Sequence, residues 1–151
     1  MAPAPNLFHQ FVQANLLCIL RPFVQQHALG TVVGAPCDVY LDEVNVFPPD
    51  VLYVTRAHAN RMLDYGIHGP PDLAIEILSP SSAAFDRRKR TLLAQAGAVE
   101  FWQVGPALRQ VQRFVFAENQ NKPVELIDEP ETFVSPLFPG LVLATTEIFR
   151  R

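Results

Sequence analysis

Residues 73–78 (LAIEIL) constrain the fold of this chain more than any other stretch of its sequence. Every position is apolar except Glu76, a composition typical of a strand that is buried on both faces of a sheet. The sequence therefore predicts a central sheet that is covered on both faces. A length of 151 residues is enough for one such core, so we expect a single domain over residues 1–151.

Apolar periodicity and turn signals predict the remaining elements. Apolar residues recur every three to four positions in residues 7–26, with Asn6 as a possible N-cap, which predicts a helix. A second helix is expected over residues 83–96, ending at Gly97. Strands are expected at residues 31–33, 37–41, 50–54, 73–78, 99–104, 110–116 and 124–127, the last two forming a hairpin. We interpret residues 56–71 as mostly loop, and residues 136–151 as a tail with one more strand or a short helix.

This order of elements predicts a mixed α/β (α+β) fold, with a central mixed sheet flanked by helices. A charged share of 18% argues against disorder, and no apolar run approaches the roughly 20 residues of a membrane span. The two cysteines, Cys18 and Cys37, form no metal spacing and no disulfide framework. Since the first residues also lack a basic signal-peptide region, we expect a protein of the reducing cytoplasm.

The charge balance limits how the chain could bind nucleic acid. A net charge of −3 lacks the basic footprint of a high-affinity nucleic-acid binder. Nucleic acid would have to be bound through a metal ion or a local basic patch. Residues 87–90 (RRKR) form the only basic run of the sequence. Such a run is usually a solvated helix face, yet it follows the buried strand where a nuclease would contact phosphates.

Two carboxylates on predicted strands are the candidate catalytic groups, because the sequence has no glycine-rich phosphate loop, HExxH, CxxC or GxSxG motif. Asp50 follows two prolines at the start of one strand, and Glu76 lies within the buried strand. Alternation places Glu76 on the face opposite Ile75 and Ile77. An ionised glutamate there is costly to bury unless a divalent cation or a lysine compensates its charge.

The second predicted helix offers such a lysine. Lys89 is four residues after Phe85 and precedes Leu92 and Leu93 by three and four, so it lies on the apolar stripe that faces the sheet. By the same spacing, Arg87 and Arg90 point elsewhere. Two acids and a lysine suit metal-assisted hydrolysis of phosphodiesters, in which the acids hold Mg²⁺ and the ammonium acts on the attacking water or the developing charge.

Four segments together resemble the Uma-type restriction endonuclease family of the PD-(D/E)xK nuclease superfamily. They are residues 49–51 (PDV), residues 71–82 (PDLAIEILSPSS), Asp86 with Lys89, and residues 97–102 (GAVEFW). The resemblance extends from about residue 6 to residue 141, and residues 71–82 are its most specific part. It implies a restriction endonuclease-like fold and a site in which Asp50 and Glu76 bind Mg²⁺ or Mn²⁺, with a backbone carbonyl near Ile77.

The resemblance also identifies the lysine. The standard superfamily pattern places it two residues after the second acid, where this chain has Leu78. The family takes it from the next helix instead, which points to Lys89. Arg90 is the alternative, because Asp86 and Lys89 are one residue closer together than the family spacing.

Three further residues each have a functional and a structural interpretation. His9 matches a family position and could lie near the substrate, although its place beside Gln10 and Gln13 is typical of a solvated histidine. Ser79 could cap the second helix or form a hydrogen bond near the metal. Asp86 could belong to the site, or pair with Arg90 on the helix surface.

The sequence thus predicts a Mg²⁺-dependent endonuclease that hydrolyses DNA, working as a homodimer because two copies can cut two strands. The alternative is a catalytically inactive module of the same fold that binds nucleic acid or protein. The low net charge, Leu78, and Leu93 in place of a family aromatic residue favour that alternative. A third hypothesis, hydrolysis of glycosides by the acid pair, lacks an aromatic sugar platform in the sequence.

Overall fold

A six-stranded sheet forms the centre of the computed structural model, which describes residues 6–79 and 83–151 except for the side chains of residues 83–86. Its order is β1-β4-β7-β8-β9-β10. The strands are β1 (Gly30–Gly34), β4 (Val51–Thr55), β7 (Leu73–Ile77), β8 (Glu100–Gly105), β9 (Gln110–Val115) and β10 (Glu125–Asp128). Strands β7 and β8 are parallel and all other neighbours are antiparallel. The predicted mixed sheet and the β9–β10 hairpin are confirmed.

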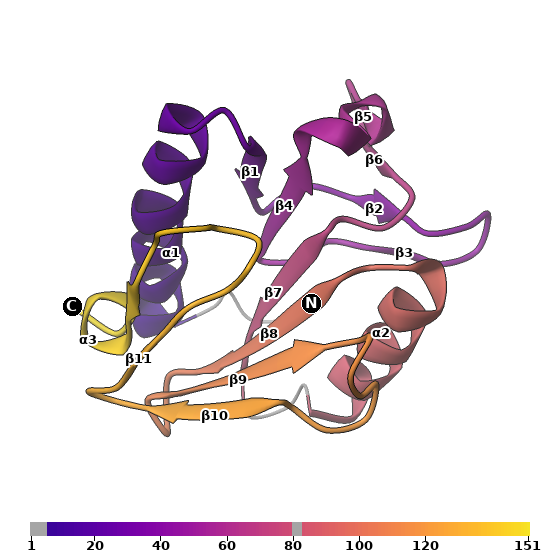
Figure 1. Cartoon of the computed structure of the whole chain (residues 1–151). Coiled ribbons are helices and arrows are strands. Elements are labelled where there is room, and N and C mark those ends of the chain that lie inside the picture. The colour runs from indigo at the N-terminus through magenta and orange to yellow at the C-terminus, as the bar shows by residue number, and fades with distance from the viewer. Residues whose placement is uncertain (1–5, 80–82) are drawn as a thin grey trace.

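Two long helices cover opposite faces of this sheet (Figure 1). Helix α1 (Leu7–Gln26) begins at the predicted N-cap, where Asn6 Oδ1 accepts a hydrogen bond from the His9 N–H at 2.8 Å. Helix α2 (Ala83–Ala96) connects β7 to β8, since parallel strands require a crossover connection. None of the helices within residues 6–79 and 83–151 has the length and apolar character that crossing a bilayer requires.

The strand β7 separates two cores. Leu73, Ile75 and Ile77 pack in the core on the α1 side, whereas Ala74 packs with Leu93 of α2 in the core on the other side. The alternation predicted for this strand is therefore confirmed. It places the side chain of Glu76 on the same side as Ala74, toward α2.

A second, four-stranded sheet of order β3-β2-β6-β5 lies on the α2 side. It consists of β2 (Val39–Tyr40), β3 (Val46–Phe47), β5 (Met62–Leu63) and β6 (Gly66–His68), with a 3₁₀ helix over Arg56–Arg61. The prediction of loop over residues 56–71 was wrong, because strands of two or three residues are too short to give a periodic signal. Asp72 stabilises the connection: its buried carboxylate accepts hydrogen bonds from the Thr55 N–H at 2.7 Å and from His58 Nδ1 at 2.9 Å.

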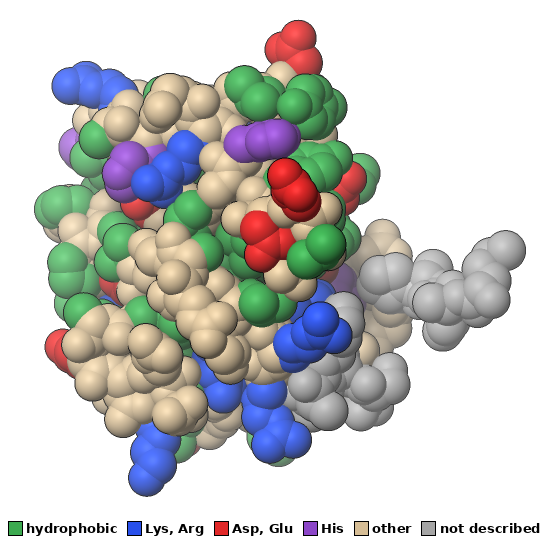
Figure 2. All heavy atoms as spheres, turned by 90° about the vertical axis from the view of Figure 1, so that its right-hand side faces the viewer, with side chains coloured by type: hydrophobic (Ala, Val, Ile, Leu, Met, Phe, Trp, Pro, Cys, Tyr) green, Lys and Arg blue, Asp and Glu red, His purple; other side chains and the backbone are tan. Residues whose placement is uncertain are grey.

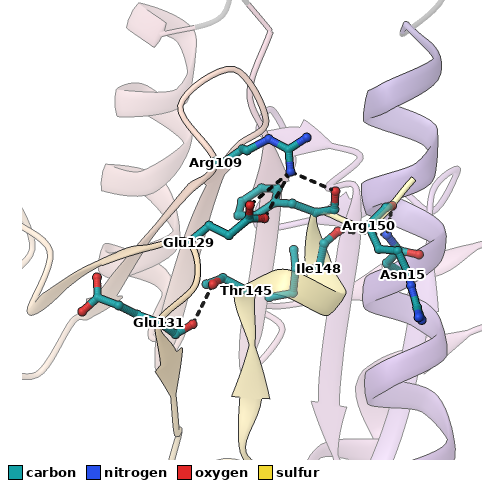
Figure 3. A network of polar contacts seen from close by, with 8 residues as sticks. Asn15, Arg109, Glu129, Glu131, Thr145, Ile148 and Arg150 are labelled. Atoms are coloured by element: carbon teal, nitrogen blue, oxygen red, sulfur yellow. Dashed lines mark hydrogen bonds and ion pairs between the residues drawn. The ribbon is translucent and has the colours of Figure 1, made fainter.

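The C-terminal segment holds both a strand and a helix, where one or the other was predicted. Strands β11 (Thr132–Phe133) and β12 (Leu143–Ala144) pair, and the short helix α3 (Thr145–Ile148) follows. Figure 3 shows how this segment is tied to the rest of the chain. Asn15 of α1 donates to the carbonyl oxygens of Ile148 and Arg150 at 3.0 and 2.7 Å, and Arg109 forms an ion pair with Glu129 at 3.1 Å.

A buried carboxylate attaches the segment before α3 to the central sheet. Glu100 is 2% exposed and accepts hydrogen bonds from Trp102 Nε1 at 3.0 Å, Arg113 Nη1 at 2.9 Å and Ser135 Oγ at 2.6 Å. Burial alone would lower the pKa of Arg113, but hydrogen bonds and charges from Glu100 and Glu125 outweigh it and raise that pKa. Three donors satisfy the Glu100 carboxylate, which offsets the cost of holding its charge away from water.

Candidate active site

The two candidate acids lie at neighbouring strands at one end of the central sheet. The antiparallel pairing of β4 with β7 reaches Val51 opposite Ile75, and Asp50 is the residue before β4. Beyond this pair, the Asp50 carboxylate accepts a hydrogen bond from the main-chain N–H of Ile77, the residue after Glu76. This hydrogen bond brings the Asp50 carboxylate next to the strand segment that carries Glu76.

Asp50 is held by contacts from three other segments. Its Oδ2 accepts a 2.7 Å hydrogen bond from the Ile77 N–H. Its main-chain oxygen accepts from the Ala35 N–H at 3.0 Å and from Gln13 Nε2 at 3.1 Å. The His9 Nε2 atom lies 3.5 Å from the other carboxylate oxygen, Oδ1. With a side chain that is still 19% exposed, Asp50 is fixed in position and open to a ligand.

Glu76 is buried against the lysine that the helical spacing singled out. Lys89 Nζ lies 3.5 Å from Glu76 Oε2, with side-chain exposures of 13% and 9%. The same ammonium lies 5.7 Å from the centroid of the Phe47 ring. A cation at this place offsets part of the cost of holding a carboxylate that is largely removed from water.

Arg90 lies elsewhere, against the sheet. The prediction that it points away from the sheet was wrong, because it is 9% exposed and its guanidinium lies 4.4 Å from the centroid of the Phe114 ring. Its long stem and flat cationic head allow it to pack on an aromatic ring inside the protein. Two adjacent cations of α2 thus have different surroundings: Lys89 lies against the carboxylate of Glu76, and Arg90 packs on the ring of Phe114.

The remaining sequence candidates are distributed around this pair. His9 was expected to be solvated, but its side chain is only 12% exposed and lies beside Asp50. Ser79 is exposed just beyond β7. The side chain of Asp86 lies outside the described residues. Sequence reasoning missed the contact of Gln13, although its spacing of four from His9 places both on one helix face.

The donor set is compatible with Mg²⁺. Within residues 6–79 and 83–151, no group of three or more His, Cys, Asp or Glu side chains is arranged to hold a metal ion. Mg²⁺ does not need such a group, because it is commonly bound by one or two carboxylates together with water and substrate phosphates. Asp50 and Glu76 supply two carboxylates, so the residues present fit Mg²⁺ and, with the same oxygen donors, Mn²⁺.

A pocket of about 170 Å³ lies between the β2–β3 turn and α2. We call it the Lys89 pocket. Its lining residues are Val44, Asn45, Val46, Phe47, Arg88, Lys89 and Leu92. Lys89 Nζ also lies 3.5 Å from Glu76 Oε2 and 5.7 Å from the centroid of the Phe47 ring, so the Lys89 side chain connects this pocket with Glu76.

A family model described as "Uma2: Putative restriction endonuclease" matches residues 1–146. No curated protein matches the sequence significantly.

The structural comparison gives a crystal structure titled as a putative nuclease belonging to DUF820 from Anabaena variabilis. It matches with a TM-score of 0.79 and 20% identity, over 97% of this chain and 83% of that chain. The type IIG restriction endonuclease BpuSI matches with a TM-score of 0.48 and 13% identity, over 99% of this chain and 16% of that chain. The first of these matches shows that the two chains share a fold.

Proposed function

This chain belongs to the Uma2 family, and on that premise we propose that it is a metal-dependent endonuclease that hydrolyses phosphodiester bonds, with DNA as its substrate. The observation that carries the proposal is the juxtaposition of Asp50, Glu76 and Lys89. The first acid is hydrogen-bonded to the strand that carries the second, and the lysine lies 3.5 Å from the second acid.

Each of these residues has a chemical role in the proposal. Asp50 and Glu76 hold Mg²⁺ or Mn²⁺, with the backbone carbonyl near Ile77 as a further ligand. A divalent cation bound there would polarise the phosphodiester and offset the negative charge that develops on it. Lys89 orients the attacking water and stabilises the charge of the transition state through its ammonium group.

The surrounding residues support this pair. His9 contacts the Asp50 carboxylate and holds its orientation, and Arg90 anchors α2 on the sheet through Phe114. Ser79 and Asp86 follow β7 in the chain, so they are the candidates for hydrogen bonds to the substrate. We further propose that residues 1–151 act as one domain and that two copies associate, because each copy can then cut one of two strands.

Metal-dependent stabilisation tests the site without requiring cleavage. Wild type and Glu76→Gln are melted with and without Mg²⁺ or Mn²⁺, with Glu118→Gln as the matched control because Glu118 is exposed beyond β9. At a metal concentration ten times the Kd, binding adds about 1.4 kcal/mol to the free energy of unfolding, which raises the Tm by about 3–6 °C. This rise is expected in wild type and in Glu118→Gln, and is lost in Glu76→Gln.

Nicking of supercoiled plasmid then tests catalysis. The proposal requires metal-dependent nicking by wild type and by Glu118→Gln, and its loss in Glu76→Gln. Equal melting of wild type with and without metal, together with no nicking, would instead favour the inactive nuclease-fold module. The net charge of −3 is the observation on which that second candidate depends.

A further inference from the structure

The Lys89 pocket combines three properties that together match one unit of a nucleic-acid strand. Its walls are apolar at Val46, Phe47 and Leu92, and cationic at Arg88 and Lys89. Its volume of about 170 Å³ is well below the roughly 300–1,000 Å³ of sites for drug-sized ligands. Planar bases bind proteins by stacking on apolar and aromatic side chains, with cations nearby for the phosphates.

The charges around the pocket are arranged unevenly. Figure 2 faces this side of the molecule and shows acidic side chains above a band of apolar ones, with basic side chains below. Asp42 and Glu43 line an adjoining pocket that shares Val46 with the Lys89 pocket. Hydrogen bonds from the Asn45 side chain and from the Val44 and Asn45 N–H groups lower the pKa of Asp42, so this rim stays negative at neutral pH.

This asymmetry disfavours phosphates on the side of the Lys89 pocket that carries Asp42 and Glu43. Phosphates are attracted to the α2 side, where Arg88 lies, and are repelled from the side of Asp42 and Glu43. A duplex that lies flat over the site would bring phosphates against both rims. A single strand that enters along α2, with one base turned into the pocket, meets only the favourable side.

We infer that the Lys89 pocket binds one unstacked nucleobase next to the scissile phosphate, and that the substrates are single-stranded or locally unpaired nucleic acid. The inference rests on the proposed function, because it places the scissile phosphate at the acid pair. A paired base must first be extruded from its stack, at a cost of a few kcal/mol. Unpaired nucleic acid does not bear this cost and therefore binds more tightly than a blunt duplex.

Binding of a short fluorescent oligothymidine, measured by anisotropy in Ca²⁺ with gels to verify that the strand stays intact, tests the pocket. The variants are Val46→Ser and Arg88→Gln, at exposed positions that the catalytic proposal does not use. The matched controls are Val142→Ser and Arg21→Gln, also at exposed positions and outside the pocket lining; Arg21 lies on α1, away from the basic run of α2. Melting curves establish that all four variants fold.

We expect Val46→Ser and Arg88→Gln each to weaken binding about fivefold to tenfold, and the controls to remain within about twofold of wild type. The salt dependence separates the two contacts. Loss of one phosphate contact reduces the slope of log K against log[salt] by about 0.7 for a single strand. This reduction is expected in Arg88→Gln and not in Val46→Ser.

A single abasic site, moved along the oligonucleotide, identifies the base that enters the pocket. In wild type, one position should lose about tenfold in affinity, and in Val46→Ser the loss at this position should shrink to about twofold. Absence of any sensitive position, equal affinity for a blunt duplex, or no binding by wild type would each overturn the inference. RNA of the same sequence shows whether the pocket discriminates the sugar.

Failure of the proposed function would give a different result. If oligonucleotide binding depends on Val46 and Arg88 but plasmid nicking is absent, the pocket is real and the chain is a binding module. If nicking requires Glu76 but Val46→Ser cleaves and binds single strands like wild type, the nuclease proposal stands and the base pocket is rejected.

Discussion

The main-chain N–H of Ile77 donates a 2.7 Å hydrogen bond to the side chain of Asp50, so a carboxylate takes the place of a strand partner where β4 begins. The regular pairing of β4 with β7 reaches only to Val51 and Ile75. The interaction that completes the sheet edge therefore also fixes the orientation of the proposed metal-binding acid. Structure and activity should respond differently when this side chain is changed.

Asp50→Asn should retain the fold and lose activity. An asparagine keeps an oxygen that can accept from the Ile77 N–H, so the free energy of unfolding should stay within about 1 kcal/mol of wild type. Loss of the negative charge removes a metal ligand, and we expect metal-dependent plasmid nicking to fall by at least about 100-fold. Asp64→Asn, at an exposed position, is the control. Normal nicking by Asp50→Asn would exclude Asp50 from the site.

Replacement of Lys89 and of Arg90 should have opposite consequences. Lys89→Met leaves Glu76 without its ammonium contact, which should cost about 1–3 kcal/mol in stability and abolish nicking. Since Mg²⁺ would then supply beside Glu76 the positive charge that Lys89 supplies in wild type, Mg²⁺ should raise the Tm of this variant more than that of wild type. Melting with and without Mg²⁺ measures the difference.

Arg90→Met is the matched comparison. It loses the contact with the Phe114 ring, worth about 1 kcal/mol, while nicking and the Mg²⁺ response stay within a few-fold of wild type. If Arg90→Met abolished nicking and Lys89→Met did not, the lysine role would belong to Arg90.

Substitution of the buried Glu100 should destabilise the fold without affecting the response to Mg²⁺. Glu100→Gln removes the charge that faces Arg113 and leaves that guanidinium largely buried, with 12% of its side chain exposed. We expect a loss of about 3 kcal/mol, which corresponds to a Tm about 6–12 °C lower. Calorimetry measures the Tm. The shift in Tm on adding Mg²⁺ should be the same as in wild type, and loss of this shift would link Glu100 to the metal site.

The raised pKa of Tyr53 predicts that the free energy of unfolding depends on pH at high pH. Burial, and then the charge of Asp72, raise its pKa above the usual value of 10.0, and its hydroxyl donates to the Leu29 carbonyl at 3.1 Å. The folded state holds this proton more tightly than the unfolded state, so the stabilisation is complete below pH 10 and is lost as the pH rises through the folded-state pKa.

Tyr53→Phe should therefore cost about 1 kcal/mol near neutral pH, and this cost should shrink as the pH rises above 10. Urea denaturation of both proteins at pH 8 to 11 measures the difference. A cost that does not change over this range would contradict the assignment.

The sequence predicts the scaffold of the site better than its surroundings. Residues 73–78 form a continuous apolar run, and Lys89 lies at helical spacing from apolar residues; both patterns extend over enough residues to be recognised in the sequence. In the second sheet, only β2 falls within a predicted strand, at residues 37–41; the other strands have two or three residues and carry no such signal. They form because tertiary packing of side chains such as Phe47 and Ile67 overrides weak local preference.

Contacts between residues that are far apart in the chain could not be predicted from the sequence either. His9 and Gln13 have the polar character of a solvated helix face, and their burial at Asp50 depends on how α1 crosses the end of the sheet. The same holds for Arg90, since an arginine can pack on a ring as readily as extend into water. The strand register and the way the helices pack on the sheet decide where these side chains lie, and no local sequence pattern specifies either.

The hydrogen bond from Asn15 to the carbonyl of Ile148 joins residues 133 positions apart in the chain, and this has a consequence for folding. A contact between such distant residues closes a long loop, and the entropic cost of closing it comes before the contact contributes any stability. Helix α1, which supplies His9 and Gln13 to Asp50, therefore gains this part of its support only once the segment around Ile148 has docked.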